Sequence, residues 1–122
     1  MAMPLFSTQT LLRLAFWLSL AAITVASLVP VVMLPPQALD LWDKAQHALG
    51  FGWLALLGLW AYPRHVLAVV VGLLVWGAAI EVMQSATGWR YGDVIDWIAD
   101  AVGVLAAWAV WRLVPARLAR RT

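Results

Sequence analysis

The sequence predicts an all-α integral membrane protein, a single domain over residues 1–122 folded as a bundle of four transmembrane helices. Three observations support this fold class. Hydrophobic residues make up 65% of the chain, and its mean hydropathy is +0.88. Charged residues make up only 11%, whereas a soluble domain has about 25%. The apolar residues fall into four runs separated by prolines, glycines and charges, and the absence of cysteine excludes disulfides and thiol chemistry.

The four apolar runs predict helices at about residues 10–29, 41–61, 66–85 and 93–114. A transmembrane helix needs about 20 apolar residues. No charged residue occurs in the range Leu14–Leu39, and Pro30 ends the first helix within that run. Pro63 ends the second helix, and Gly88 and Gly92 mark the loop before the fourth.

The first run has an alternative interpretation, a cleaved signal peptide that ends near Ala26 and Ser27. The apolar part of a signal peptide normally has about 7–15 residues. This run is longer, continues beyond Pro30 and is preceded by a single charge, Arg13. A retained transmembrane helix is therefore the prediction.

The fourth helix indicates how deep the acidic residues lie. Its charge-free part, Ala101–Trp111, has only 11 residues. At about 1.5 Å per residue that is too short for a hydrocarbon core of about 30 Å. With the aspartates that precede it the helix has about 22 residues, which is enough. Asp96 and Asp100 are therefore expected inside the membrane or at its boundary.

The distribution of basic residues predicts the orientation, because four spans put both termini on one side. The side opposite the termini receives Lys44 and Arg90. The side with the termini receives six arginines: Arg13, Arg64, Arg112, Arg117, Arg120 and Arg121. By the positive-inside rule both termini are predicted to be cytoplasmic. The arginines near the C-terminus are typical of an anchor beside anionic lipid, so the expected partners are membrane lipids and no nucleic acid is expected.

Most acidic residues gather near the predicted outer ends of the helices. Residues 78–103 hold four of the six, and the spacing of Asp93, Asp96, Asp100 and Gly103 places them on one helical face, within roughly 80°. His47 and Glu81 are predicted at a similar depth, roughly 7–10 Å into their helices. The predicted polar cluster comprises Asp43, Lys44, His47, Glu81, Gln84, Arg90, Asp93, Asp96 and Asp100. The small residues expected to let the helices pack closely are Gly50, Gly77 and Gly103.

Glu81 needs a partner, because an unpaired charge inside a membrane helix costs about 2–4 kcal/mol. Arg90 is predicted to pair with it and to keep spare donors for an anionic headgroup. His47 is expected to donate to Asp43 or, alternatively, to carry a proton. An alternative role for Asp43 and Lys44 is to complement the helix dipole with their charges at the start of a helix.

A metal site built from His47, Glu81 and the aspartates is a further alternative. The chain has no local ligand motif such as HExxH. The prediction is therefore that the protein holds neither a metal nor a cofactor.

The order of the polar residues resembles a known family. The pattern runs Asp43-Lys44-x-x-His47, Glu81-x-x-Gln84, Arg90-x-x-Asp93-x-x-Asp96 and Asp100-x-x-Gly103. Over about residues 10–114 the chain is similar to the VanZ-like family of small bacterial membrane proteins, named after a glycopeptide (teicoplanin) resistance determinant. The resemblance implies a four-helix envelope protein in the bacterial cytoplasmic membrane, with an expected link to teicoplanin tolerance, and it implies no reaction. The chain departs from the family at Asp100, where asparagine is usual, and so carries an additional negative charge.

Three functions remain open from the sequence. The first is a non-enzymatic envelope protein whose cluster binds an anionic lipid or cell-wall precursor headgroup. The second is a membrane-embedded enzyme that acts on a phospholipid or polyprenyl-linked substrate, with a carboxylate as acid or base. In the third, the cluster only holds helices together. An open groove leading to Glu81 and His47, beside an unpaired carboxylate, would favour the first two. A dry, mutually paired cluster would favour the third.

Overall fold

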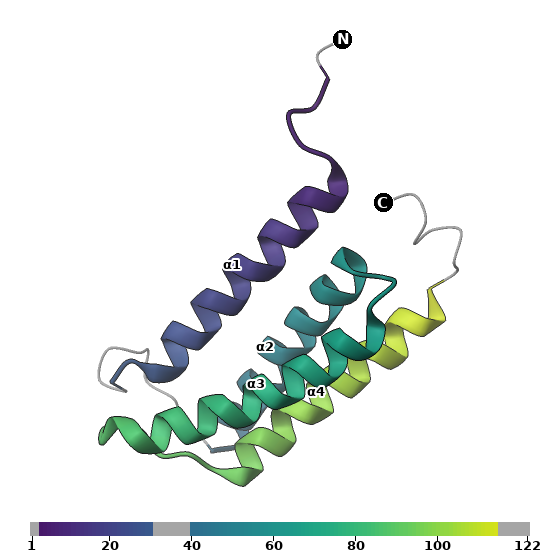
Figure 1. The fold of residues 1–122 in the computed structure, drawn as a ribbon. Coiled ribbons are helices and arrows are strands. Elements are labelled where there is room, and N and C mark those ends of the chain that lie inside the picture. The colour runs from purple at the N-terminus through teal and green to yellow at the C-terminus, as the bar shows by residue number, and fades with distance from the viewer. Residues whose placement is uncertain (1–2, 31–39, 115–122) are drawn as a thin grey trace.

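The computed structural model describes residues 3–30 and 40–114, and for residues 40–43 it describes the backbone alone. These residues form four helices, α1 Thr8–Leu28, α2 Asp40–Ala61, α3 Val66–Thr87 and α4 Val94–Leu113. No strand occurs among them, so the all-α prediction is confirmed, and each predicted boundary lies within two residues of the observed one. Successive helices run in opposite directions (Figure 1).

Local chemistry explains where several helices begin and end. The Ser7 hydroxyl accepts the N–H of Thr10 at 3.1 Å and caps α1. The Asp93 carboxylate accepts the N–H of Ile95 at 2.9 Å and caps α4 in the same way. α3 ends at Gly88, whose φ of +82° is in the left-handed region that glycine adopts without strain.

Three of these helices, α1, α3 and α4, are long and apolar enough to cross a membrane. α2 has 22 residues but is the least hydrophobic of the four, because Lys44, Gln46 and His47 lie in its first half. It also supplies the largest share of the buried core, including residues with no exposed surface: Leu54, Ala55, Leu59 and Ala61. The neighbouring helices therefore cover the helix that is least suited to contact lipid.

The closest helix contact is between α2 and α4, which pack on each other more extensively than any other pair. This contact depends on Gly103, because a Cβ there would overlap the carbonyl group of Ala48. Small residues allow two helix backbones to approach in this way. Gly52 faces the same spot from α2, where an added Cβ would lie 3.4 Å from the Gly103 carbonyl oxygen.

The other two glycines predicted to allow close packing differ from each other. A Cβ at Gly77 would lie 3.2 Å from Asp100 Oδ2 and 3.3 Å from Phe51 Cε1, which is tight. At Gly50, an added Cβ would meet Ile23 Cδ1 at 3.7 Å, an ordinary contact with no other described atom within 4 Å. A Cβ at position 77 would therefore require its neighbours to shift by a few tenths of an ångström, whereas a Cβ at position 50 would fit.

Side chains of α1 cover the carbonyl end of α2. Gln9 Nε2 donates to the carbonyl oxygens of Ala61 and, at 3.2 Å, Trp60, and Arg13 Nε donates to Ala61 at 3.3 Å. The guanidinium carbon of Arg13 also lies 4.8 Å from the centre of the Tyr62 ring. The last carbonyls of a helix have no partner within it, and the side chains of Gln9 and Arg13 supply donors to two of them. These bonds therefore attach the start of α1 to the end of α2.

Candidate functional site

An ion-pair network joins α2 to the start of α4. The Lys44 ammonium lies 3.3 Å from Asp93 Oδ2 and also contacts Asp96 Oδ1. The Ile95 N–H that the Asp93 side chain accepts, together with Lys44, holds the pKa of the Asp93 carboxyl below its usual range. Asp96 is 8% exposed, so Lys44 supplies the positive charge that this buried carboxylate needs.

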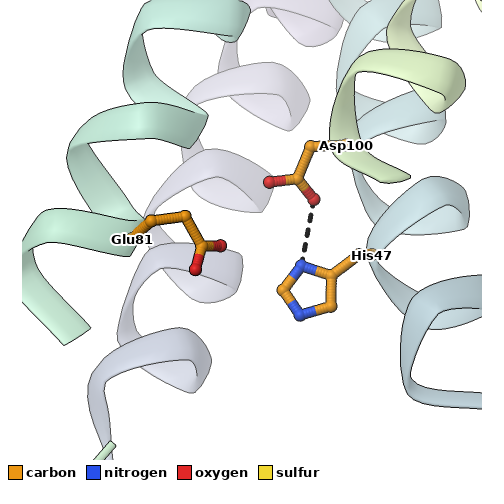
Figure 2. A group of neighbouring side chains, drawn as sticks. All are labelled: His47, Glu81 and Asp100. Carbon is orange, nitrogen blue, oxygen red and sulfur yellow. Dashed lines mark hydrogen bonds and ion pairs between the residues drawn. The ribbon is translucent and has the colours of Figure 1, made fainter. Parts of the chain in front are cut away.

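One helical turn farther along α2 and α4, His47 faces Asp100. His47 Nδ1 lies 3.0 Å from Asp100 Oδ1 (Figure 2), and His47 Nε2 lies 3.8 Å from Asp96 Oδ2. Asp100 is 1% exposed, and its other oxygen, Oδ2, has no hydrogen-bond partner among the described residues. That oxygen packs against Gly77 of α3. A side chain at position 77 would therefore displace the Asp100 carboxylate.

Glu81 approaches the same point from α3. Its Oε2 accepts the backbone N–H of Asp93 at 2.8 Å, and its Oε1 has no hydrogen-bond partner among the described residues. Glu81 is 8% exposed. One ligand atom from each of His47, Glu81 and Asp100 lies within 4.8 Å of the other two. Figure 2 shows the three side chains directed toward one another from three helices.

Six of the nine predicted cluster residues lie together at this end of the bundle: Lys44, His47, Glu81, Asp93, Asp96 and Asp100. The side chain of Asp43 lies outside the described part of the chain, so its pairing with His47 stays a prediction. The remaining two residues, Gln84 and Arg90, take another role.

Arg90 and Gln84 bind the end of α1. Arg90 Nη1 donates to the Val29 carbonyl oxygen at 3.3 Å, and Gln84 Nε2 donates to the Ser27 carbonyl oxygen at 2.8 Å. Arg90 forms no ion pair with Glu81, although both side chains are described. The predicted Glu81–Arg90 pair is therefore wrong.

The physical reason is the set of unpartnered carbonyl groups at the end of α1. The last turn of α1 has no basic residue that could cover them. Trp89 Nε1 donates to the Leu28 carbonyl oxygen at 2.8 Å, between the bonds made by Gln84 and Arg90. The acceptors are three consecutive carbonyls, and Glu81 meanwhile has the backbone N–H of Asp93 as its donor.

The model of the VanZ/LLP1 family matches residues 3–115. The chain belongs to the VanZ/LLP1 family. The matched range contains all four helices and the whole cluster, so the resemblance seen in the order of the polar residues is confirmed. No curated protein and no solved structure matches the chain.

In this VanZ/LLP1 family member, a groove of about 510 Å³ lies between α3 and α4 and reaches the cluster at Glu81. Its polar end is formed by Glu81, Ser85 and Asp93, and the rest of its lining is mostly apolar: Ala78, Val82, Gly92, Val94 and Trp97. Ser85 was not among the predicted cluster residues. Its spacing of four residues from Glu81 on one helix was the signal that could have identified it.

A second groove of about 520 Å³ lies between α1 and α3. Its lining is largely aromatic and aliphatic, with Phe16 and Trp17 from α1 and Leu73 and Trp76 from α3. It does not include any of the six clustered residues. Of the six clustered residues, Glu81 and Asp93 line the α3–α4 groove.

The combination of an open groove and unpaired buried oxygens bears on the three functions left open by the sequence. A cluster that served only to hold helices together would pair its carboxylates fully. Glu81 Oε1 and Asp100 Oδ2 are unpaired among the described residues, and Glu81 lines the groove. The arrangement favours a ligand or a substrate over a purely structural cluster.

Proposed function

We propose that this protein binds the headgroup of a membrane lipid, or of a lipid-linked cell-wall precursor, in the groove between α3 and α4. The observation that carries the proposal is Glu81, which lines the polar end of a groove with apolar walls and whose buried Oε1 has no hydrogen-bond partner among the described residues. Ligand pockets combine such apolar walls with a few convergent polar groups.

The lining also indicates the chemistry of the headgroup. The polar end offers hydrogen-bond acceptors, the carboxylates of Glu81 and Asp93 and the hydroxyl of Ser85. Arg90 donates to the end of α1 and does not line the groove. The expected anionic headgroup therefore has no arginine to pair with, and we propose a headgroup that binds through its own donors, ammonium or hydroxyl groups. The apolar walls, with Val82 and Trp97, are suited to the attached chain.

Lipid that copurifies with the protein tests this proposal. Val82→Trp fills the groove from α3, where Val82 is 70% exposed. Val71→Trp is the matched control, because Val71 is an exposed residue of the same helix three turns away and lines neither groove. Mass spectrometry of extracts from the purified proteins should show bound lipid with wild type and Val71→Trp, and a large loss with Val82→Trp.

A third variant, Glu81→Gln, tests the headgroup rather than the groove. The glutamine keeps an acceptor for the Asp93 N–H and removes the charge, so the amount of lipid should stay similar while the preferred headgroup changes. Equal lipid on Val82→Trp and Val71→Trp would refute binding in this groove.

The proposal includes a four-span topology in the bacterial cytoplasmic membrane with both termini cytoplasmic. The cover that α2 receives from its neighbours supports a fourth span despite its polar residues. Arg13, Arg64 and Arg112 lie at the end of the bundle where α1 begins and α4 ends, and Lys44 and Arg90 lie at the other. Arg117, Arg120 and Arg121 lie outside the described residues. A phosphatase that is active only in the periplasm, fused after Thr122, should be inactive.

A membrane-embedded enzyme is the second candidate, favoured by the 3.0 Å contact between His47 and Asp100 beside Glu81. A histidine oriented by a carboxylate is a frequent general base. Lipid extracts of strains that express wild type or His47→Ala provide the test. A lipid species that only the wild type consumes or produces supports the enzyme, and identical extracts support binding alone. Growth of the same strains at graded teicoplanin concentrations tests the expected link with tolerance.

A further inference from the structure

We infer that His47, Glu81 and Asp100 form a binding site for one divalent transition-metal ion, of the Zn²⁺ or Mn²⁺ class. This inference goes beyond lipid binding and does not depend on it. It rests on the separation of the donor atoms, on two unpartnered oxygens and on the charge of the site.

The separations suit coordination by side-chain movement alone. Ligands bound at about 2.0–2.2 Å lie about 3.3–3.6 Å apart at the tetrahedral angle that zinc prefers, and about 3 Å apart at a right angle. His47 Nδ1 and Asp100 Oδ1 lie 3.0 Å apart, and one ligand atom from each of His47, Glu81 and Asp100 lies within 4.8 Å of the other two. A small rotation of the Glu81 carboxyl group can bring Oε1, which has no hydrogen-bond partner among the described residues, toward the other two ligand atoms, while Oε2 is held by the Asp93 N–H.

Two oxygens at the site have no donor, and this observation is independent of the clustering. Glu81 Oε1 and Asp100 Oδ2 are buried and have no partner in the part of the chain that the structure describes. Their residues are more than nine-tenths buried, and both carboxylates point into the space between the three side chains (Figure 2). Leaving a buried charged acceptor without a donor costs more than the loss of a neutral hydrogen bond, whereas coordination to a cation satisfies it.

The charges of the site match a divalent ion. Lys44 pairs with the Asp96 carboxylate and with Asp93, whose side chain is 43% exposed to solvent. The carboxylates of Glu81 and Asp100 remain, and a protonated His47 neutralises only one of them. A divalent ion bound by neutral His47 and both carboxylates gives a site without net charge, which lowers the cost of burial at membrane depth.

The surroundings resemble the supporting shell of a metal ligand. With the ion at Nδ1, His47 Nε2 lies 3.8 Å from Asp96 Oδ2, which is beyond hydrogen-bond distance, so a small shift of either side chain is needed for Nε2–H to donate to this carboxylate. A histidine that binds a metal commonly donates its other ring N–H to a carboxylate, which fixes the ring orientation. Asp96 is held by Lys44, so Asp96 is a positioning residue and not a ligand.

The donor set indicates the class of ion and its reactivity. One imidazole nitrogen with two carboxylate oxygens suits Zn²⁺ or Mn²⁺ better than Ca²⁺ or Mg²⁺, which prefer oxygen alone. Three protein ligands leave at least one coordination position for water or another ligand, as in catalytic zinc sites. Glu81 also lines the α3–α4 groove, so this position is next to the groove.

Metal titration of the full-length protein tests the inference. The protein, purified in detergent without a histidine tag and stripped with a chelator, is titrated with Zn²⁺ and, separately, Mn²⁺ and Mg²⁺ in a calorimeter. Wild type should bind one Zn²⁺ per chain, more tightly than Mg²⁺. His47→Ala, Glu81→Gln and Asp100→Asn should each lose at least about tenfold in affinity, and Asp96→Asn should lose about 10–100-fold, as the loss of a supporting carboxylate does.

His65→Ala is the matched control, because His65 is an exposed histidine at the turn between α2 and α3. Its Zn²⁺ affinity should equal that of wild type. Zn²⁺ should also raise the melting temperature of wild type, followed by circular dichroism, but not that of Asp100→Asn, a variant that keeps the shape of the side chain. If a variant does not fold, the absorption spectrum of Co²⁺ added to wild type is measured instead of binding by that variant. A spectrum that matches fully hydrated Co²⁺ counts against the site. No Zn²⁺ binding by wild type, unchanged binding in the three ligand variants, or loss of binding in His65→Ala would each overturn the inference.

Discussion

The contact between α2 and α4 gives a prediction whose magnitude follows from the structure. Gly103→Ala adds a Cβ that would overlap the Ala48 carbonyl, so the two helix backbones must separate. Overpacking of this kind costs about 1–3 kcal/mol. The same substitution also removes a glycine from the interior of a helix, which stabilises by about 0.5–1 kcal/mol. The measured change combines both effects, so a control that isolates the first is needed.

Gly72→Ala is that control, because a Cβ at Gly72 meets no described atom within 4 Å. It carries the same gain in helix propensity without the overlap, and it should be slightly more stable than wild type. The difference in unfolding free energy between the two variants should therefore be about 1–3 kcal/mol. Unfolding by sodium dodecyl sulfate in mixed micelles, followed by far-ultraviolet circular dichroism, measures both. If Gly103→Ala is as stable as Gly72→Ala, the close approach of α2 and α4 is refuted.

Three further predictions concern the polar side chains. The pKa of Asp93 is lowered in the folded protein. The charged Asp93 carboxylate therefore stabilises the fold at any pH above the pKa of an ordinary aspartate. This contribution is lost as the pH falls through the lowered pKa of the folded state. Asp93→Asn keeps a good helix cap, so thermal melts should show it less stable than wild type at neutral pH, with a gap that closes in acid. In a double-mutant cycle, Glu81→Gln and Arg90→Gln should have additive effects on unfolding free energy within about 0.5 kcal/mol, because their side chains bind different groups; a larger coupling would restore the predicted pair. Gln9→Leu should cost about 1–3 kcal/mol, because the Trp60 carbonyl at the end of α2 loses its side-chain donor and the Ala61 carbonyl keeps only Arg13, and an unchanged melting temperature would contradict that role.

The positions of the helices could be predicted because a membrane helix is long, apolar and ended by residues that are easy to recognise. Pro63 and Gly88 lie next to helix ends in the structure, as expected. The convergence of His47, Glu81 and Asp100 could also be anticipated, because ionisable groups in apolar helices turn toward the interior of a bundle and toward one another.

The roles of Gln84 and Arg90 could not be predicted in the same way. In the sequence, Glu81 is a carboxylate that needs a cation, and Arg90 is the nearest arginine. Its actual acceptor is the Val29 carbonyl, and every residue has a carbonyl group. Whether that group lacks a partner depends on where a helix stops and on what lies beside its end. Only the packed structure supplies this information.

The Gly50 prediction has a related explanation. Glycines recur along α2, and the spacing alone does not show which of them faces a neighbouring backbone. The structure places Gly52 against α4, whereas a side chain at Gly50 would have room. Gly58, which was not predicted, is tighter, because a Cβ there would lie 2.8 Å from Val69 Cγ1 and 3.0 Å from Phe16 Cε2.

The hydrogen bonds made at the two ends of α1 have a consequence for the order in which the helices assemble during synthesis. Gln9 and Arg13 precede α2, so the contact between the start of α1 and the end of α2 can form as soon as α2 has been made. The opposite end of α1 must wait, because the donor for Val29 lies 61 residues later, in the loop after α3. A nascent chain that stops after α2 would therefore be a hairpin that is closed at one end only. We expect α1 to reach its final position in the bundle only when α3 and the loop after it have entered the membrane.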